Sequence, residues 1–321
     1  MSLRLGPGGE FDRIRAITAA LGERAAGLGD DCALLPAAAG SLAVSTDTSV
    51  EGVHFRLDWI GLREAGGRAA AAALSDLAAE GADAAGVLAA VVVPRGSSES
   101  ELVELMLGVG DAAAAAGARV VGGDLTQADG GWTIGVTVLG WAATPVTRAG
   151  AGPSDGIWVT GTLGGARAAL EAWLRGAVPE AAAREVFARP VPRLAAGRWL
   201  ASHGARAMLD LSDGLAGDAD HLAAASGVAL ELELELVPVH PSAIAEARRL
   251  DLPVQQFAAE GGEDYELLVA LPPEIAEAES REFERACGLA LTRIGRAERG
   301  RGVHARLAGR PLALRGFDHF R

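Results

Sequence analysis

The chain has 321 residues, half of them hydrophobic, and a formal net charge of −13. This length exceeds the size at which one hydrophobic core usually stops growing, so two domains of roughly 150 residues are expected. The negative charge disfavours nucleic acid and an anionic membrane as main partners, because both require basic patches. All 29 basic residues are arginine, which excludes a Walker phosphate-binding loop, since that motif needs a lysine.

The cysteines and the N-terminus predict a cytoplasmic protein. Cys32 and Cys287 lie far apart in the sequence and form neither a disulfide framework nor a metal-ligand pair by spacing. Residues 1–9 lack the basic start and apolar run of a secretory signal, and no stretch reaches the ~18 apolar residues of a membrane span. We therefore expect a soluble chain with no membrane partner.

The first half of the chain alternates strand and helix patterns. The expected elements are, in order, a strand at 42–47, a helix at 63–81, a strand at 87–93, a helix at 98–117 and a strand at 132–141. A further strand, ARVVGGD, is expected to end in a turn at Gly122-Gly123-Asp124. This order predicts an α/β or α+β architecture.

The second half repeats this order of elements after a loose stretch at 143–153, which is rich in Thr, Pro, Gly and Ala. We expect a domain boundary there, dividing the chain into domains 1–145 and 146–321. The expected elements are a strand at 156–162, a helix after Gly164, a helix at 193–203, a strand at 207–211 and a helix through His221. The strictly alternating segment 231–236 (ELELEL) predicts a half-buried strand with its three glutamates facing water.

Acidic motifs beside Gly, Ser or Thr recur along the chain. They are Gly29-Asp30-Asp31, Ser45-Thr46-Asp47, Ser75-Asp76, Gly123-Asp124, Ser212-Asp213 and Gly262-Glu263-Asp264. Carboxylates at turns and strand ends supply hard oxygen ligands, and neighbouring glycines let the backbone approach a phosphate closely. The pattern predicts a site for Mg²⁺ and a polyphosphate.

Some of these motifs also fit a purely structural interpretation. Asp30 fits a solvated loop, Ser75 an N-cap, His54 a structural histidine and Arg148 a solvated linker charge. Two signals are stronger. A strand delivers the hydroxyls and carboxylate of Ser45-Thr46-Asp47 to its polar end. Asp76 lies in an apolar helical run, where a carboxylate needs a partner or an ion.

Two strings in the second half are also informative. Asp210 and Asp213 lie at a strand end and then at a helix start, with a spacing that does not match an EF-hand loop. Ser212 or Asp213 also fits a plain N-cap. The string GGEDYEL at 261–267 places two glycines, three acids and the only tyrosine before a strand, a combination that surface turns seldom need.

Together, these strings in this order resemble the thiamine-monophosphate kinase family, within the superfamily that includes aminoimidazole ribotide synthetase. The resemblance extends from about Glu10 to Arg321. Its carriers are GDD at 29–31, STDTSVEGVHF at 45–55, LSDLAAEGA at 74–82, GGDLT at 122–126, VTRAGA at 146–151, LDLSDGL at 209–215, GGEDYELL at 261–268 and GFDHF at 316–320.

The resemblance implies two α/β domains and a homodimer in which the N-terminal domains pair into a β-barrel. Domain 1–145 would bind ATP and Mg²⁺ and dimerise, and domain 146–321 would complete the active site. Several Mg²⁺ ions would be held by Asp30, Ser45, Thr46, Asp47, Asp76, Asp124, Asp210 and Asp213. ATP would contact Gly123, Asp124, Arg148 and Ser212, and thiamine monophosphate would contact His54, Glu263 and Phe317.

The implied reaction is direct in-line transfer of a phosphoryl group from ATP to thiamine monophosphate. Mg²⁺ ions would offset the charge of both substrates in a lysine-free cleft. The acceptor is a phosphate oxygen that is mostly ionised near neutral pH, so no general base is expected. Four positions depart from the usual family pattern, namely Ala73, Glu80, Leu125 and Gly165. None of them is a proposed metal ligand.

Other interpretations remain open. Among ATP-using enzymes of the superfamily, selenophosphate synthetase relies on a catalytic Cys or selenocysteine and a lysine, and the hydrogenase-maturation relative ends in a cysteine. This chain ends in His319-Phe320-Arg321. Aminoimidazole ribotide synthetase lacks the combination of GGEDYEL and GFDHF. A catalytically silent nucleotide or Mg²⁺ sensor is kept open by Ala73 and Leu125. A structural dimer would scatter its aspartates over random faces.

Overall fold

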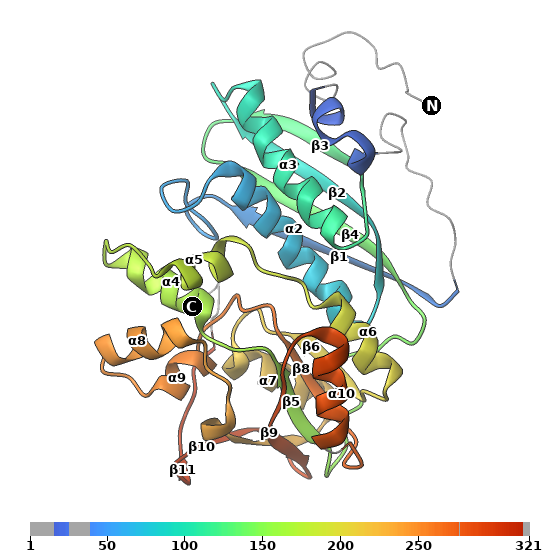
Figure 1. The fold of residues 1–321 in the computed structure, drawn as a ribbon, viewed down its shortest axis with the longest axis vertical. Coiled ribbons are helices and arrows are strands. Elements are labelled where there is room, and N and C mark those ends of the chain that lie inside the picture. Colours follow the sequence, from blue (N-terminus) through green and yellow to red (C-terminus); the bar gives the residue numbers. More distant parts are fainter. Residues whose placement is uncertain (1–15, 26–38, 276, 317–321) are drawn as a thin grey trace. The chain divides into compact units, whose positions relative to one another are not determined.

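The computed structural model describes residues 16–25, 39–275 and 277–316 (Figure 1). The chain divides into two compact units. Unit 1 comprises Met1–Leu77 and Asp83–Ala143, and unit 2 comprises Ala78–Ala82 and Thr144–Arg321. No helix among the described residues is long and apolar enough to cross a membrane.

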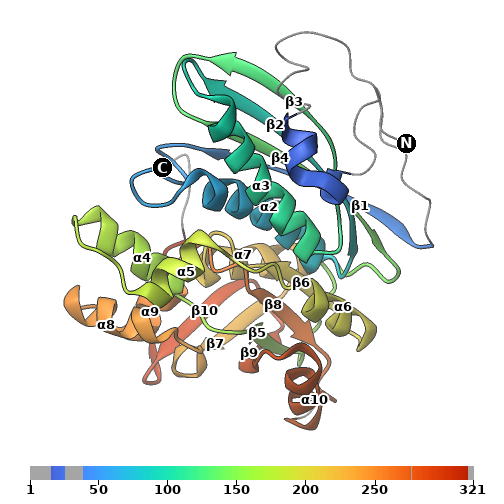
Figure 2. The same cartoon turned by 45° about the horizontal axis from the view of Figure 1, so that its top comes forward.

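Unit 1 is a four-stranded sheet with helices on one face. The strands are β1 (Ser41–Val50), β2 (Asp83–Pro94), β3 (Val120–Ala128) and β4 (Thr133–Ala142), in the spatial order β1-β4-β2-β3. Strand β4 is antiparallel to both β1 and β2, whereas β2 and β3 are parallel. Helices α2 (Leu62–Ala79) and α3 (Glu99–Ala115) lie side by side over the sheet (Figure 2), and the short η1 spans Gly22–Ala25.

Glycines set the close packing of α2 against α3. A Cβ at Gly66 would lie 2.0 Å from the Leu105 carbonyl oxygen, and one at Gly108 would lie 1.8 Å from that of Arg63. Any larger residue at these points would force the two backbones apart. Helix α3 also begins with a capping box between Ser98 and Glu101. These features fix the position of α2, which holds one of the predicted metal ligands.

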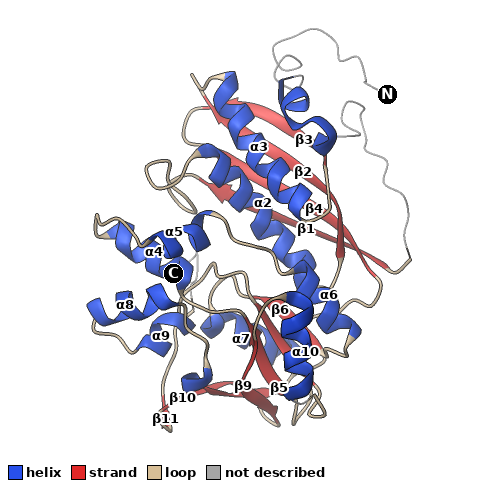
Figure 3. Ribbon diagram, viewed as in Figure 1, coloured by secondary structure: helices blue, strands red, loops and turns tan. Residues whose placement is uncertain are grey.

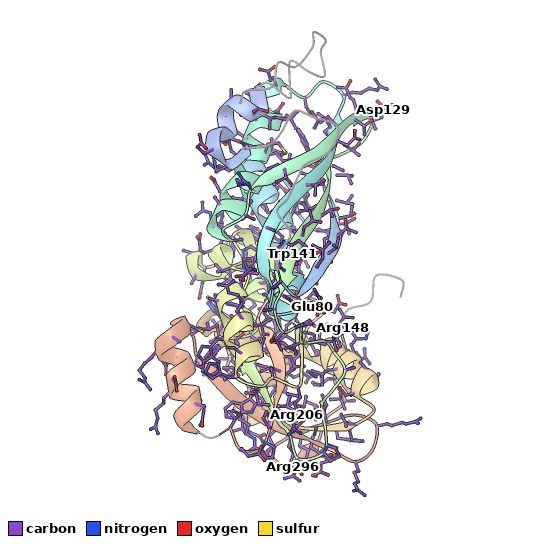
Figure 4. The ribbon with its side chains drawn as sticks, turned by 90° about the vertical axis from the view of Figure 1, so that its right-hand side faces the viewer. Glu80, Asp129, Trp141, Arg148, Arg206 and Arg296 are labelled. Atoms are coloured by element: carbon purple, nitrogen blue, oxygen red, sulfur yellow. The ribbon has the colours of Figure 1, made fainter. Side chains whose placement is uncertain are left out.

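The other face of the unit 1 sheet carries several apolar side chains, and none of the helices labelled in this unit covers it. Leu42 and Val44 on β1 are 50% and 57% exposed. Leu139 and Trp141 on β4 are half-buried and share this face with them, because Val44 is paired with Leu139 and Leu42 with Trp141. Figure 4 labels Trp141 on this sheet. Such a face is typical of a surface that packs against another protein.

The predicted turn at Gly122-Gly123-Asp124 is wrong, because these residues lie inside β3. Gly123 is paired with Ala89 of the parallel strand β2, and a Cβ at Gly123 would lie 2.1 Å from the Ala89 carbonyl oxygen. The register of this pair shifts between Val87 and Leu88. The glycine is therefore required by a close backbone approach within the sheet and not by a turn.

Unit 2 is a seven-stranded sheet with helices around it (Figure 3), in the strand order β11-β10-β7-β9-β5-β8-β6. The strands are β5 (Gly156–Thr160), β6 (Ala207–Asp210), β7 (Ala229–Glu233), β8 (Leu267–Leu271), β9 (Leu291–Glu298), β10 (Gly302–Leu307) and β11 (Arg310–Pro311). The helices are α4 (Gly165–Leu174), α5 (Ala181–Ala188), α6 (Leu194–Ser202), α7 (Leu215–Ser226), α8 (Pro241–Arg249), α9 (Val254–Ala259) and α10 (Glu277–Cys287). Fully buried Leu230, Leu268 and Ile294 lie in its core.

The prediction of one strand over 231–236 is only partly right. Strand β7 ends at Glu233, and Leu234–Leu236 form the 3₁₀ turn η2. Leu234 remains fully buried within this turn, so the alternating pattern continues after the strand has ended. Glu231 is also not free in water, because its side chain is 28% exposed and lies 3.9 Å from Arg306.

Candidate functional site

In unit 1, the carboxylates of Asp47 on β1 and Asp76 on α2 lie close together. Ser45 and Asp47 alternate along β1 on the face that packs toward the helices, and both are half-buried. The Ser45 hydroxyl donates a hydrogen bond to the Asp76 carboxylate on α2. The structure therefore brings together three residues that the sequence predicts as metal ligands, two of them on strand β1 and one on helix α2.

The electrostatics of this cluster favour a bound cation. Burial, followed by the negative charge of Asp76, raises the pKa of Asp47 from 3.8 to about 6. A half-buried carboxylate beside a like charge is stabilised either by a proton or by a cation. Serine hydroxyls and carboxylates are oxygen ligands of the kind that Mg²⁺ prefers.

We expect the affinity of unit 1 for Mg²⁺ to rise with pH. Because the folded pKa of Asp47 is about 6, Mg²⁺ must displace a proton below that pH, and affinity should increase by up to about tenfold per pH unit until the pKa is passed. Without Mg²⁺, the raised pKa means that Asp47 binds a proton more tightly in the folded state than in the unfolded state. The contribution of Asp47 to folding stability therefore falls as pH rises from 3.8 to about 6. Calorimetric Mg²⁺ titrations at several pH values test this, and the slope should flatten in Asp47→Asn. An affinity independent of pH in the unaltered protein would contradict it.

Thr46 does not join this cluster through its side chain. It lies on the opposite face of β1, where its hydroxyl is 3.0 Å from the Thr137 hydroxyl on β4. Successive side chains of a strand point to opposite faces, so the hydroxyls of Ser45 and Thr46 cannot serve one ion. Only the Thr46 backbone carbonyl remains as a ligand beside Asp47.

Asp124 also lies apart from Asp47 within one chain. Asp47 is paired with Val136, and Ala89 is paired with both Val136 and Gly123. These paired residues form one row across the sheet, and the row lies on the helix-covered face. Asp124 is in the next row and faces the other side. It lies on β3, three strand spacings of about 4.8 Å from β1. One chain therefore does not bring both carboxylates to the same ion.

The predicted contact residue His54 follows β1 in a tight turn. Its Nδ1 atom accepts a hydrogen bond of 3.1 Å from the Val50 backbone N–H. A neutral ring in this arrangement carries its proton on Nε2. Asp30 and Phe317, predicted to bind Mg²⁺ and thiamine monophosphate, lie outside the described residues.

In unit 2, the turn after β6 lies directly against the loop before β8. The Glu263 backbone N–H donates to the Ser212 carbonyl at 2.7 Å. The glycines are required by this contact, since a Cβ at Gly214 would lie 2.7 Å from the Gly261 carbonyl oxygen and one at Gly262 would lie 2.6 Å from that of Ser212. The fold thus brings together Ser212 and Glu263, which the family resemblance implies as contacts of ATP and thiamine monophosphate.

Three aspartates lie close together around this turn. Asp210 is buried at the end of β6 and Asp213 is half-buried in the turn. Asp218, in the first turn of α7, accepts a hydrogen bond of 3.1 Å from the Asp213 backbone N–H. Burial, followed by the charges of Asp210 and Asp213, raises the pKa of Asp218 to about 8. Sequence reasoning does not single out Asp218, because its placement depends on the direction in which α7 leaves the Gly214 turn.

The loop that contains Glu263 has a strained backbone. Glu263 and Tyr265 have φ angles of 65° and 51°, a left-handed region that side chains other than glycine rarely adopt. Between them, the fully buried Asp264 carboxylate accepts the Gly164 backbone N–H at 2.9 and 3.0 Å, at the start of α4. Burial raises the pKa of Asp264 well above its ordinary value. Strain of this kind is concentrated at functional sites.

Glu266 anchors the other end of this loop. Its carboxylate accepts two hydrogen bonds from Arg193, of 2.6 and 3.0 Å, and one of 2.6 Å from the Thr160 hydroxyl.

Arg148, predicted to contact ATP, is exposed, and its carbonyl accepts a hydrogen bond of 3.0 Å from the Ser226 hydroxyl. Its guanidinium is thus on the surface of unit 2.

Comparison with known families shows matches over most of the chain. Residues 29–142 match the N-terminal domain of the AIR synthase related proteins, and residues 152–308 match their C-terminal domain. The thiamine-monophosphate kinase of Rhodopirellula baltica is 32% identical over 305 residues, which cover 92% of this chain and 90% of the relative.

Solved structures agree with these matches. The thiamine-monophosphate kinase of Stenotrophomonas maltophilia K279a has a TM-score of 0.81 at 34% identity, covering 94% of this chain and 96% of its own. A structure described as "AaThiL complexed with AMPPCP and TMP" has a TM-score of 0.78 at 31% identity, with 100% of both chains covered. The chain belongs to the thiamine-monophosphate kinase family of AIR synthase related proteins.

Proposed function

We propose that this chain transfers the γ-phosphoryl group of ATP to thiamine monophosphate and so forms thiamine diphosphate. Its relatives are named for this kinase activity, and one solved relative holds AMPPCP together with TMP. Within the chain, the observation that supports the proposal most directly is the hydrogen-bonded pair of Ser45 and Asp76 beside Asp47. The test is formation of thiamine diphosphate from ATP and thiamine monophosphate, with free thiamine as a control acceptor.

The carboxylates of the chain fit several Mg²⁺ ions. ATP and a phosphomonoester together bring roughly six negative charges at neutral pH, and the chain has no lysine with which to offset them. Bound Mg²⁺ would neutralise the phosphates and orient the acceptor oxygen. We assign the ligands to Asp30, Ser45, Asp47, Asp76, Asp124, Asp210, Asp213 and the backbone carbonyl of Thr46.

The remaining residues would bind and orient the two substrates. We assign Gly123, Arg148 and Ser212 to ATP, and His54, Glu263 and Phe317 to thiamine monophosphate. His54 would donate from Nε2, because its Nδ1 already accepts the Val50 N–H. In these terms, domain 1–145 supplies the unit 1 carboxylates and dimerises, and domain 146–321 supplies the residues around Ser212 and Glu263.

We propose direct in-line transfer without a phosphoenzyme. The acceptor is a phosphate oxygen that is already mostly ionised near neutral pH, so no side chain has to remove a proton. Rapid mixing with ATP labelled at the γ position, followed by acid quench, tests this step. Label is expected in thiamine diphosphate only, and label bound covalently to an aspartate would contradict direct transfer.

We also propose a homodimer in which the unit 1 sheets of two copies pair into a β-barrel. The exposed apolar face with Leu42 and Val44 would then be covered, and the edge strands β1 and β3 would each gain a partner. Pairing of β1 with β3 of a second copy would bring Asp124 of that copy to the β1 edge, where an ion lying at the edge could be reached by Asp47 from one face of the sheet and by Asp124 from the other. Each metal site would then use carboxylates from both copies.

Mixed dimers test this arrangement. Asp47→Asn and Asp124→Asn are each expected to be inactive alone, whereas dimers that contain one copy of each have one site with both carboxylates intact. Random mixing should therefore restore about a quarter of the unaltered activity. A mixture of Asp47→Asn with Asp76→Asn is the control and should restore none, because Asp76 and Ser45 beside Asp47 are joined within one chain. No recovery in the first mixture would contradict the shared site.

A catalytically silent nucleotide or Mg²⁺ sensor is the alternative from another class. It is favoured by Ala73 and Leu125, which depart from the usual family pattern. Another ATP-using enzyme of the superfamily is the second alternative. The acceptor assay separates all three, because a sensor binds ATP without consuming it and another enzyme consumes ATP without forming thiamine diphosphate.

A further inference from the structure

Asp213, Asp218 and His221 in unit 2 form a cluster with the geometry of a metal site. One ligand atom from each side chain lies within 4.8 Å of the ligand atoms of the other two. None of the expected Mg²⁺ contacts involves Asp218 or His221, and the family resemblance assigns a metal role only to Asp213. The imidazole distinguishes this cluster from the all-oxygen group of Ser45, Asp47 and Asp76 in unit 1.

The backbone holds the three ligands in place before any ion binds. Gly214 has a φ of 92° and turns the chain from Asp213 into α7. Asp218 lies in the first turn of α7, and His221 follows three residues later, so both side chains lie on one face of the helix. Asp218 also accepts the Asp213 N–H at 3.1 Å, which ties the turn to the helix.

Asp218 has no cationic partner among the residues that the structure describes. Its side chain is buried, with 5% of the residue exposed, and no ion pair among the described residues involves Asp213 or Asp218. The carboxylate is held by backbone N–H groups of the Ser212-Asp213 turn, which carry no formal charge. A buried carboxylate close to two others, without a counter-charge, is strongly unfavourable unless a cation or a proton compensates it.

The ligand types indicate which cation would bind. Two carboxylates and one imidazole form a mixed oxygen and nitrogen set, which suits borderline divalent cations such as Mn²⁺ and Zn²⁺ better than Mg²⁺ or Ca²⁺. His221 is exposed, so one side of the site is open to water or to a phosphate oxygen. An open coordination position is typical of sites that bind a ligand as well as an ion.

We propose that Asp213, Asp218 and His221 form a divalent transition-metal site in which His221 is a nitrogen ligand and Asp218 is a buried carboxylate ligand. The metal would bind at this site when the chain holds no nucleotide. It does not depend on the proposed kinase activity.

Pulsed electron paramagnetic resonance of the full chain loaded with Mn²⁺ tests this site, since an imidazole ligand produces ¹⁴N modulation that carboxylates cannot produce. We expect this modulation in the unaltered protein and its loss in His221→Ala. His304→Ala is the matched control, because His304 is also exposed in unit 2 but lies on β10. The control is expected to retain the signal. Absence of ¹⁴N modulation in the unaltered protein, or its persistence in His221→Ala, would overturn the proposal.

Asp218→Asn provides a second test. The amide oxygen can still accept the Asp213 N–H, so the turn is retained while the charge is lost. Mn²⁺ affinity at the nitrogen-coupled site should fall by at least about tenfold, whereas Asp220→Asn, which alters an exposed residue of the same helix, should leave it unchanged. Equal affinities in both variants would overturn the role of Asp218. Loss of thiamine diphosphate formation with an intact ¹⁴N signal would count against the kinase proposal alone.

Discussion

Asp76→Asn is expected to lower the turnover number for thiamine diphosphate formation by about a hundredfold to a thousandfold at saturating Mg²⁺. The amide can still accept the Ser45 hydroxyl, but it supplies no negative charge to a bound cation. Folding should not suffer, because the Asp76 charge raises the pKa of neighbouring Asp47 and its removal relieves that repulsion. Steady-state kinetics and thermal unfolding of the same variant separate the two effects.

Asp129→Asn is the matched control for this prediction. Asp129 also lies in unit 1, but its side chain is 90% exposed and forms an ion pair with Arg95. Figure 4 labels it on a loop of this unit. Its replacement should leave turnover and Mg²⁺ dependence unchanged. Near-normal turnover of Asp76→Asn and Asp47→Asn at saturating Mg²⁺ would show that the unit 1 carboxylates do not form the catalytic metal cluster.

Glu266→Ala is expected to have the largest effect on stability, a loss of about 3–5 kcal/mol. The side chain is 4% exposed and receives both hydrogen bonds of the Arg193 guanidinium, which is itself 25% exposed. Its removal leaves a largely buried arginine without its carboxylate and the Thr160 hydroxyl without its acceptor. Urea unfolding followed by circular dichroism measures the change.

Glu298→Ala is the control for the buried pair. Glu298 pairs with Arg296 at 2.6 Å, but the two side chains are 43% and 58% exposed. Solvent-exposed pairs contribute at most about 1 kcal/mol, so this variant should unfold close to the unaltered protein. Similar losses in both variants would mean that the Arg193–Glu266 pair is not a structural anchor of the loop that contains Glu263.

The elements with strong periodicity could be predicted from the sequence. The apolar run at 87–93 and the alanine-rich stretch at 63–81 are a strand and a helix in the structure. Two errors have local causes. The Gly-Gly pair at 122–123 is typical of turns, but here a neighbouring backbone requires it. The alternating pattern at 231–236 continues beyond the end of β7, because Leu234 is buried although it lies in a 3₁₀ turn.

The residue types of the candidate site were predictable, but their grouping was not. Ser45 and Asp76 meet only because α2 packs on β1, and Thr46 is turned away by the strand's own alternation. The separation of Asp47 from Asp124 depends on strand order, which no local motif encodes. The position of Asp218 depends on the direction in which helix α7 leaves the Gly214 turn. Tertiary placement therefore decides which carboxylates can share an ion.

The most direct measurement follows the γ-phosphoryl group of labelled ATP when the protein is supplied with thiamine monophosphate, once with Mg²⁺ and once with excess chelator. We expect label in thiamine diphosphate only when Mg²⁺ and the monophosphate are both present, and none with free thiamine as acceptor. Protein that binds ATP and Mg²⁺ but forms no labelled thiamine diphosphate would contradict the proposed function.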